Sequence, residues 1–99
     1  MAIFGNKIRE LREAKKLKLR ELAATLNIDS ATLSKIERGV RNASKNQVYL
    51  LSEILNYDLS ELKSLWLANK IYEIVSDEEE ALIAIQVAEK EIKYQSKQA

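Results

Sequence analysis

The chain has 99 residues, of which 46% are hydrophobic and 31% charged, so it suits one globular domain and cannot supply two independent cores. It contains no cysteine and no histidine, which excludes disulfides, thiolate chemistry, nearly all transition-metal sites and the usual general base of nucleophilic catalysis; we expect no enzyme and no cofactor. The net charge of +1 combines a basic part, residues 1–57 with 11 Lys/Arg and 6 Asp/Glu, and an acidic part, residues 58–99 with 5 Lys/Arg and 9 Asp/Glu.

Composition also bounds the fold class and the compartment. With no proline, two glycines and many Leu, Ala, Glu, Lys and Ile residues, the chain is expected to be all-α. No N-terminal apolar run is typical of a signal peptide, and no stretch approaches the roughly 20 apolar residues of a membrane span. We therefore expect a soluble, cytoplasmic protein that does not contact a membrane.

A first helix is expected from about residue 5 to residue 16. Phe4, Ile8 and Leu11 form one apolar stripe at helical spacing, and Asn6 is a candidate N-cap. Arg12 lies on the side of this stripe, which is an unusual position for an arginine unless it has a partner.

Two short helices joined by a tight turn are expected next, at about residues 19–26 and 30–38. Asn27 tolerates the left-handed conformation of such a turn, Asp29 can cap the second helix, and Gly39 stands where that helix ends. Lys18 holds the N-cap position of the first helix and is expected to cap nothing. The outward positions of the second helix are small, polar or basic, as in a helix that enters a DNA groove: Ser30, Ala31, Ser34, Lys35 and Arg38.

Capping pairs predict the remaining three helices. Ser44 with Gln47 starts a fourth helix, and Asp58 with Glu61 starts a fifth at about residues 59–75. Ser76 with Glu79 predicts a sixth helix at about residues 77–94, with the acidic run 77–80 in its first turn.

The last helix is more apolar than a simple helical hairpin requires. Ala81, Ile85, Ala88 and Ile92 follow one another at spacings of 4, 3 and 4, which is typical of a coiled-coil seam. We interpret residues 63–94 as a dimerisation module, with additional monomer core as the alternative. The candidate dimerisation residues are Trp66, Ile71, Ala81, Leu82, Ile85, Ala88 and Ile92.

The first 62 residues resemble the lambda-repressor-like helix-turn-helix domain of the Xre family. The residues that carry the resemblance are Ile8, Leu11, Arg12, Leu17, Glu21, Leu22, Ala23, Asn27, Ile28, Ser30, the run 32–39, Arg41, Asn42, Leu51, Leu55 and Leu62. The resemblance implies a five-helix DNA-binding domain at residues 1–62, and the apolar pattern that follows it predicts a helical dimerisation extension at residues 63–99.

The resemblance also implies roles for single residues. The helix at residues 30–38 would be the recognition helix, with Ser30, Ala31, Thr32 and Lys35 contacting bases. Arg12 and Glu37 would form a structural ion pair. The residues that would contact DNA phosphates are Lys18, Leu19 (through its backbone N–H), Arg20, Ser34, Arg38, Arg41, Asn42 and Lys45.

The sequence therefore predicts a transcriptional regulator that binds a near-palindromic operator on double-stranded DNA as a homodimer. It would act as a repressor by blocking RNA polymerase or as an activator by contacting it, and no small-molecule ligand is expected. The C-terminal extension resembles those of restriction-modification controllers and small developmental regulators. The alternative is an antitoxin or another protein-interaction module whose C-terminal helices bind a partner protein. A small hydrolase is excluded by the missing cysteine, histidine and phosphate-binding glycine loop.

Overall fold

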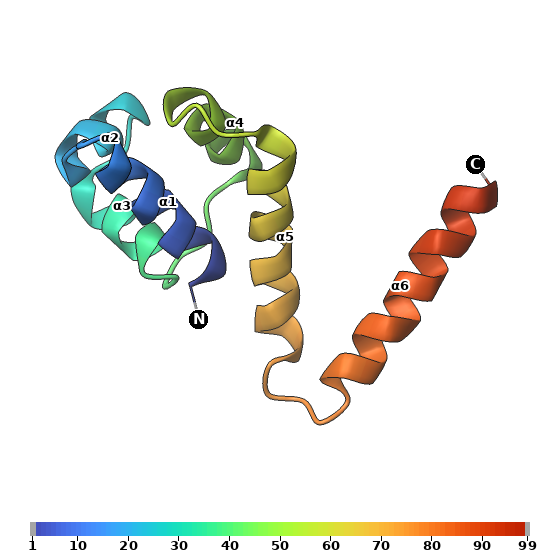
Figure 1. Ribbon diagram of the computed structural model, residues 1–99. Coiled ribbons are helices and arrows are strands. Elements are labelled where there is room, and N and C mark those ends of the chain that lie inside the picture. Colours follow the sequence, from blue (N-terminus) through green and yellow to red (C-terminus); the bar gives the residue numbers. More distant parts are fainter. Residues whose placement is uncertain (1, 99) are drawn as a thin grey trace.

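The computed structural model describes residues 2–98, and all of its regular structure over that range is helical (Figure 1). This agrees with the all-α prediction. The helices are α1 (Ile3–Ala14), α2 (Leu19–Thr25), α3 (Ser30–Glu37), α4 (Lys45–Ile54), α5 (Leu59–Val75) and α6 (Ala81–Gln98). None of these helices is both long enough and apolar enough to cross a membrane, as far as the described residues go.

Local capping signals predict the starts of α3, α4 and α5 correctly. Asp29 accepts a hydrogen bond from the backbone N–H of Thr32 at 2.7 Å. Ser44 and Gln47 cap reciprocally, and Asp58 accepts the backbone N–H of Glu61 at 3.0 Å. These side chains satisfy N–H groups that have no partner in the first turn of a helix.

The turn between α2 and α3 also follows from local chemistry. Asn27 has φ = 58°, in the left-handed region that asparagine tolerates better than most residues. The side chain of Lys18 makes no capping bond to α2, as predicted, but the carboxylate of Glu21 accepts the backbone N–H of Lys18 at 2.7 Å. The start of α2 is therefore stabilised by a side chain of the helix itself, that of Glu21.

The start of α1 was predicted wrongly. The helix begins at Ile3, two residues before the expected position, so Asn6 lies inside it and is not its cap. Ala2, in the N-cap position, has no capping side chain. The backbone N–H of Phe4 instead donates to the side-chain oxygen of Asn69, a buried residue of α5, at 3.3 Å. A cap supplied from 65 residues away leaves no signal near the helix that it caps.

One apolar core joins α1 to α5. It consists of the buried side chains Phe4, Ile8, Leu22, Ala23, Leu26, Leu33, Ile36, Ala43, Val48, Leu51, Leu55, Leu62 and Trp66. Trp66 is 7% exposed, and its indole Nε1–H donates to the carbonyl oxygen of Ala43 at 2.8 Å. Its side chain therefore belongs to the core of its own chain and offers little surface to a second chain, contrary to its place among the candidate dimerisation residues.

The last helix begins later than predicted, at Ala81. Ser76 is the C-cap of α5, because its backbone N–H continues the α5 ladder by donating to the carbonyl oxygen of Tyr72 at 2.8 Å. The Ser76–Glu79 capping pair is thus wrong, and the acidic run 77–80 lies in the connection between α5 and α6 instead of in the first turn of α6. The helix continues to Gln98, beyond the expected end at residue 94.

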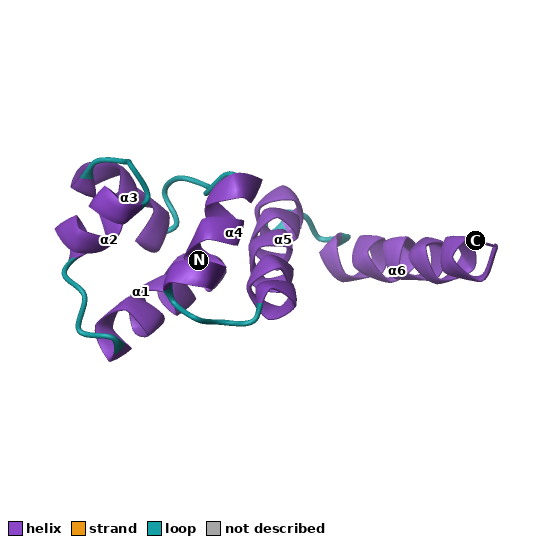
Figure 2. Cartoon of the chain, turned by 90° about the horizontal axis from the view of Figure 1, so that it is seen from above, coloured by secondary structure: helices purple, strands orange, loops and turns teal. Residues whose placement is uncertain are grey.

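The body of the fold and α6 are separate in space. Helices α1 to α5 form the packed body. After the connection that follows α5, α6 extends away from this body (Figures 1 and 2). No residue of α6 is buried over its described length. The apolar side chains of α6 therefore face solvent in the single chain.

Candidate nucleic-acid interface

The α2–turn–α3 unit is held in one arrangement by its buried faces. Leu22, Ala23 and Leu26 of this unit are buried together with Leu33 and Ile36. Ala23 is small enough for the two helices to cross closely, and its carbonyl oxygen accepts the backbone N–H of Ile28 at 3.0 Å. The other faces of both helices are left for contact with a ligand.

The four candidate base-contacting residues all lie on the first two turns of α3. Ala31 and Lys35 are exposed, and Ser30 and Thr32 are half-buried. Thr32, through its side chain first and its backbone N–H second, lowers the pKa of the Asp29 carboxyl. Asp29 thus stays ionised and holds the start of α3 in place.

The exposed cations around α3 have the Asp29 carboxylate near them, because the charges of Lys35 and Arg41 contribute to lowering its pKa, but they form no close ion pair. None of them forms an ion pair within 4.0 Å with any residue of the described range 2–98; they are Lys18, Arg20, Lys35, Arg38, Arg41 and Lys45. Arg38 is held only by a hydrogen bond from its Nε to the hydroxyl oxygen of Ser34, at 3.3 Å. Unpaired cations on one part of a surface attract a polyanion such as DNA.

The remaining candidate phosphate contacts are less uniform. Asn42 is exposed in the loop after α3, whereas Ser34 and Leu19 are half-buried. The Ser34 hydroxyl oxygen accepts from Arg38, which leaves its O–H free to donate to a phosphate oxygen. The structure therefore brings the basic members of the predicted set to the surface and leaves two of the uncharged members partly covered.

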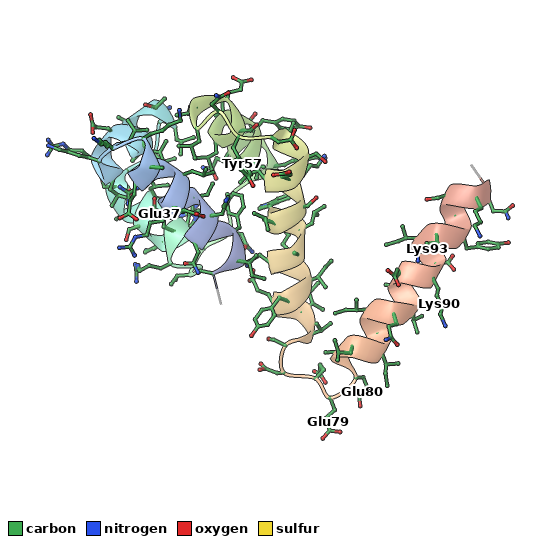
Figure 3. All side chains as sticks on the ribbon, viewed as in Figure 1. Glu37, Tyr57, Glu79, Glu80, Lys90 and Lys93 are labelled. Atoms are coloured by element: carbon green, nitrogen blue, oxygen red, sulfur yellow. The ribbon has the colours of Figure 1, made fainter. Side chains whose placement is uncertain are left out.

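Arg12 and Glu37 fix α3 against α1. The Arg12 Nε and Nη2 atoms donate to the two carboxylate oxygens of Glu37 at 2.7 and 3.1 Å, and Nη1 donates to the carbonyl oxygen of Leu17 at 2.9 Å. The side chains of Arg12 and Glu37 are only 12% and 6% exposed. The hydrogen bonds to Glu37 raise the pKa of Arg12. The Arg12 side chain thus connects α1, the end of α3 and the loop before α2. Figure 3 labels its partner Glu37 within the packed body of the fold.

Gly5 is a second, unpredicted support for α3. Its backbone lies so close to the end of α3 that a Cβ atom there would collide with the carbonyl oxygens of Ile36 and Glu37. Backbone atoms cannot move aside as a flexible side chain can. Glycine is therefore required by the close crossing of α1 and α3, although nothing in the local helix pattern indicates this.

Arg9 is another residue that the sequence analysis did not identify. It lines a groove of about 250 Å³ between α1, α2 and α3, together with Arg12, Leu19, Ser34, Glu37 and Arg38. Its ion pair with Glu13 is long, at 3.7 Å, and exposed. Arg9 lies one helical turn before Arg12, and this spacing was the available signal.

The candidate dimerisation residues other than Trp66 lie apart from this interface, on α6 and the second half of α5. Ile71, Leu82, Ile85, Ala88 and Ile92 are exposed, and Ala81 is half-buried. A groove of about 590 Å³ runs between α5 and α6. Its lining residues are Ile71, Val75, Ala84, Ile85, Ala88, Glu89, Ile92 and Lys93.

Comparisons with known proteins bear on the α1–α5 body. Residues 8–62 match the family model described as Helix-turn-helix. The chain is also 51% identical, over 45 residues, to a Bacillus subtilis (strain 168) protein named "Uncharacterized HTH-type transcriptional regulator RghRB". That match covers 46% of this chain and 32% of the relative, so the chain spans about a third of the length of that protein. No solved structure gives a significant match. Because the family model covers more than half of the chain, the chain belongs to the Xre-like helix-turn-helix family of DNA-binding transcriptional regulators.

Proposed function

We propose that this chain is a sequence-specific transcriptional regulator that binds a near-palindromic operator as a homodimer, with α3 as the recognition helix in the major groove. The observation that carries this proposal is the exposed, unpaired cluster of cations around α3, on a helix whose outward side chains are small. A bulky apolar surface there would instead suit a protein partner.

The proposed contacts fall into two classes. Lys35 donates to guanine O6 or N7 or to a phosphate, Ser30 and Thr32 bond bases, and Ala31 contacts a thymine methyl group. Lys18, Arg20, Arg38, Arg41 and Lys45 bind phosphates and position the helix. Because no bidentate arginine, asparagine or glutamine stands among the base-contacting residues, DNA shape and bridging waters supply part of the specificity.

The position of α3 supports this proposal. A recognition helix must be held at a fixed angle, since an ångström of displacement breaks hydrogen bonds to base edges. Arg12, Gly5 and the Asp29 cap hold both ends of α3 independently of DNA. The reading surface is therefore formed before DNA binds, and little conformational entropy is lost on binding.

The proposal is tested by selecting bound duplexes from a random DNA pool with the full chain. We expect two inverted half-sites whose centres lie about 10–10.5 base pairs apart, or a multiple of that distance. Recovery of sequences no different from the starting pool would contradict sequence-specific binding. Recovery of one asymmetric site bound by one chain would contradict the homodimer.

A further inference from the structure

The exposed apolar side chains of the described residues are concentrated on α6 and the second half of α5. Among the twelve large hydrophobic side chains that are exposed, only Val40 and Tyr49 lie elsewhere. The other ten are Leu67, Ile71, Tyr72, Ile74, Leu82, Ile83, Ile85, Val87, Ile92 and Tyr94. Single exposed hydrophobic residues are ordinary, whereas ten of them concentrated on two neighbouring segments indicate an interface.

The coiled-coil seam of α6 faces the grooves between α6 and α5. Ile85, Ala88 and Ile92 line the groove with Ile71 and Val75, and Ala81 lines an adjoining groove of about 500 Å³. The seam therefore stands open toward the space that one further helix would fill, with α5 on one side and α6 on the other.

The order of residues in the seam distinguishes between the two ways in which two copies of α6 can pair. In a parallel pair each residue meets its own copy, which gives layers of two alanines or two isoleucines. In an antiparallel pair centred between Gln86 and Val87, Ala81 faces the partner's Ile92 and Ile85 faces the partner's Ala88. Every layer then combines one small and one large side chain, which packs to uniform density.

The charges at the two ends of α6 favour the same arrangement. The acidic run 77–80 precedes the helix, and Lys90, Lys93 and Lys97 lie in its second half. Figure 3 shows Glu79 and Glu80 in the connection that leads into α6, and Lys90 and Lys93 along the helix. A parallel pair would bring the two acidic runs together. An antiparallel pair instead places the acidic end of each helix beside the half of the partner helix that carries the lysines.

These charges are not compensated within one chain. Glu80 and Lys93 are thirteen positions apart, about 20 Å along a helix, and cannot form a pair in the same chain. Lys93 has only a weak and exposed contact with Glu89, at 3.9 Å. The complementary charge for each end of α6 is thus carried by the opposite end of another α6.

We propose that two copies of this chain pair through antiparallel α6 helices, each α6 lying in the groove between α5 and α6 of the other copy. This inference rests on the homodimer of the proposed function and specifies its geometry. The isoleucines of the seam cover Ile71 and Val75 of the partner subunit, and the reversed charges set the direction. A second copy is the occupant because the Ala/Ile order of α6 complements itself when a second α6 runs in the opposite direction.

Disulfide trapping tests the direction directly, because the chain has no cysteine of its own. Ala81→Cys and Ile92→Cys chains, distinguished by a small tag on one of them, are mixed and oxidised gently. The antiparallel pair predicts a disulfide between the two different variants and almost none between identical chains. Disulfides between identical chains would overturn the antiparallel register. Lys90→Cys, on the outer face of the paired helices, is the control and should give little cross-linking.

Exchange of small and large side chains tests the same pairing without a cross-link. Ile92→Ala creates layers of two alanines and Ala81→Ile creates layers of two isoleucines in the antiparallel register, so each single variant should raise the dimer dissociation constant about tenfold. The Ala81→Ile/Ile92→Ala double variant should regain most of the original affinity, because each of these layers again combines one isoleucine with one alanine. A double variant as weak as the sum of the single variants, or a chain that sediments as a monomer at micromolar concentration, would overturn the inference.

The same variants separate this inference from the proposed function. If the chain selects a palindromic operator but Ala81→Cys and Ile92→Cys chains form no disulfide, the result contradicts the dimer geometry and supports the proposed function. If the disulfide forms but the chain selects no DNA sequence, the result contradicts the proposed function and supports the dimer geometry. Each claim can therefore fail alone.

Discussion

Arg12 of α1 donates two hydrogen bonds to the carboxylate of Glu37 at the end of α3, at 2.7 and 3.1 Å. Both side chains are largely removed from water. Removing one partner leaves the other charge buried, and such a loss costs about 3–5 kcal/mol. We predict that Glu37→Ala lowers the thermal midpoint by about 10 °C or more, measured by circular dichroism.

The double variant makes that prediction specific. In Arg12→Ala/Glu37→Ala no buried charge remains unpaired, so its loss of stability should be smaller than the sum for the two single variants. A midpoint for Glu37→Ala within about 2 °C of the parent chain would contradict the buried pair.

Gly5→Ala tests the close crossing of α1 and α3. At an ordinary helix position this change stabilises by up to about 1 kcal/mol, because alanine loses less backbone entropy. Here the new methyl group meets the carbonyl oxygens of Ile36 and Glu37. We predict a loss of about 1–3 kcal/mol in urea denaturation. Asn6→Ala, an exposed neighbour in the same helix, is the control and should change stability by less than about 0.5 kcal/mol. An increase in stability for Gly5→Ala would show that the two helices do not cross this closely.

The cap of α3 predicts a specific dependence of stability on pH. Because Thr32 lowers the pKa of Asp29 in the folded state, the stabilisation is complete above the ordinary carboxyl pKa and is lost as pH falls through the folded value. The Asp29→Ala chain should be less stable than the parent at neutral pH, and the difference should shrink as pH falls from about 5 to about 3.

Asp29→Asn is the matched control for that titration. Asparagine is an equally good N-cap but does not ionise, so this variant should keep the stability of the cap at acid pH. A difference between Asp29→Ala and the parent that stays constant over the same pH range would contradict the ionised cap.

The parts of the fold that the sequence predicts well are those in which cause and effect lie within a few residues. Asp29, Ser44 and Asp58 cap the helices that follow them, and Asn27 adopts the left-handed turn conformation. The start of α6 was predicted wrongly, although the prediction rested on a local pair, Ser76 and Glu79. The backbone N–H of Ser76 instead donates to the last turn of α5.

The contacts that could not be predicted join residues far apart in the chain. Asn69 caps α1, and Trp66 donates a hydrogen bond to the carbonyl oxygen of Ala43 from within the core. Gly5 leaves room for the backbone at the end of α3. In each of these contacts one partner has an ordinary local environment, so only the tertiary structure identifies its role. The Arg12–Glu37 pair was expected only because of the family resemblance.

Lys35 and Arg41 should affect DNA binding in different ways. Lys35→Ala, on the second turn of α3, should cost about 1–3 kcal/mol on the selected operator and relax the preference at one base position. Arg41→Ala, in the loop after α3, should weaken binding to all duplexes alike and reduce the dependence on salt by about one ion. Fluorescence anisotropy over a range of salt concentrations measures both.

A control for these variants removes a cation elsewhere. Lys63→Ala, on α5, should leave affinity and salt dependence nearly unchanged. If Arg41→Ala altered base preference and left the salt dependence intact, its assignment to a phosphate would be wrong.

Removal of residues 77–99 separates the body from α6. No described residue of α6 is buried, so α1 to α5 should remain folded without it and lose only the stabilisation that dimerisation gives. The truncated chain should be monomeric in sedimentation and should bind the operator far more weakly, since the second half-site is no longer held nearby. A truncated chain that still binds a full palindrome as a dimer would contradict the role of α6.

The central claim is that two copies of α3 read two half-sites of one operator. It is tested most directly by measuring how many chains bind the selected palindrome, and with what affinity, compared with a duplex that carries one half-site in a scrambled flank. We predict two chains on the palindrome and a loss of affinity of about a hundredfold or more on the single half-site at equal salt. One chain per palindrome, or equal affinity for the two duplexes, would contradict the account.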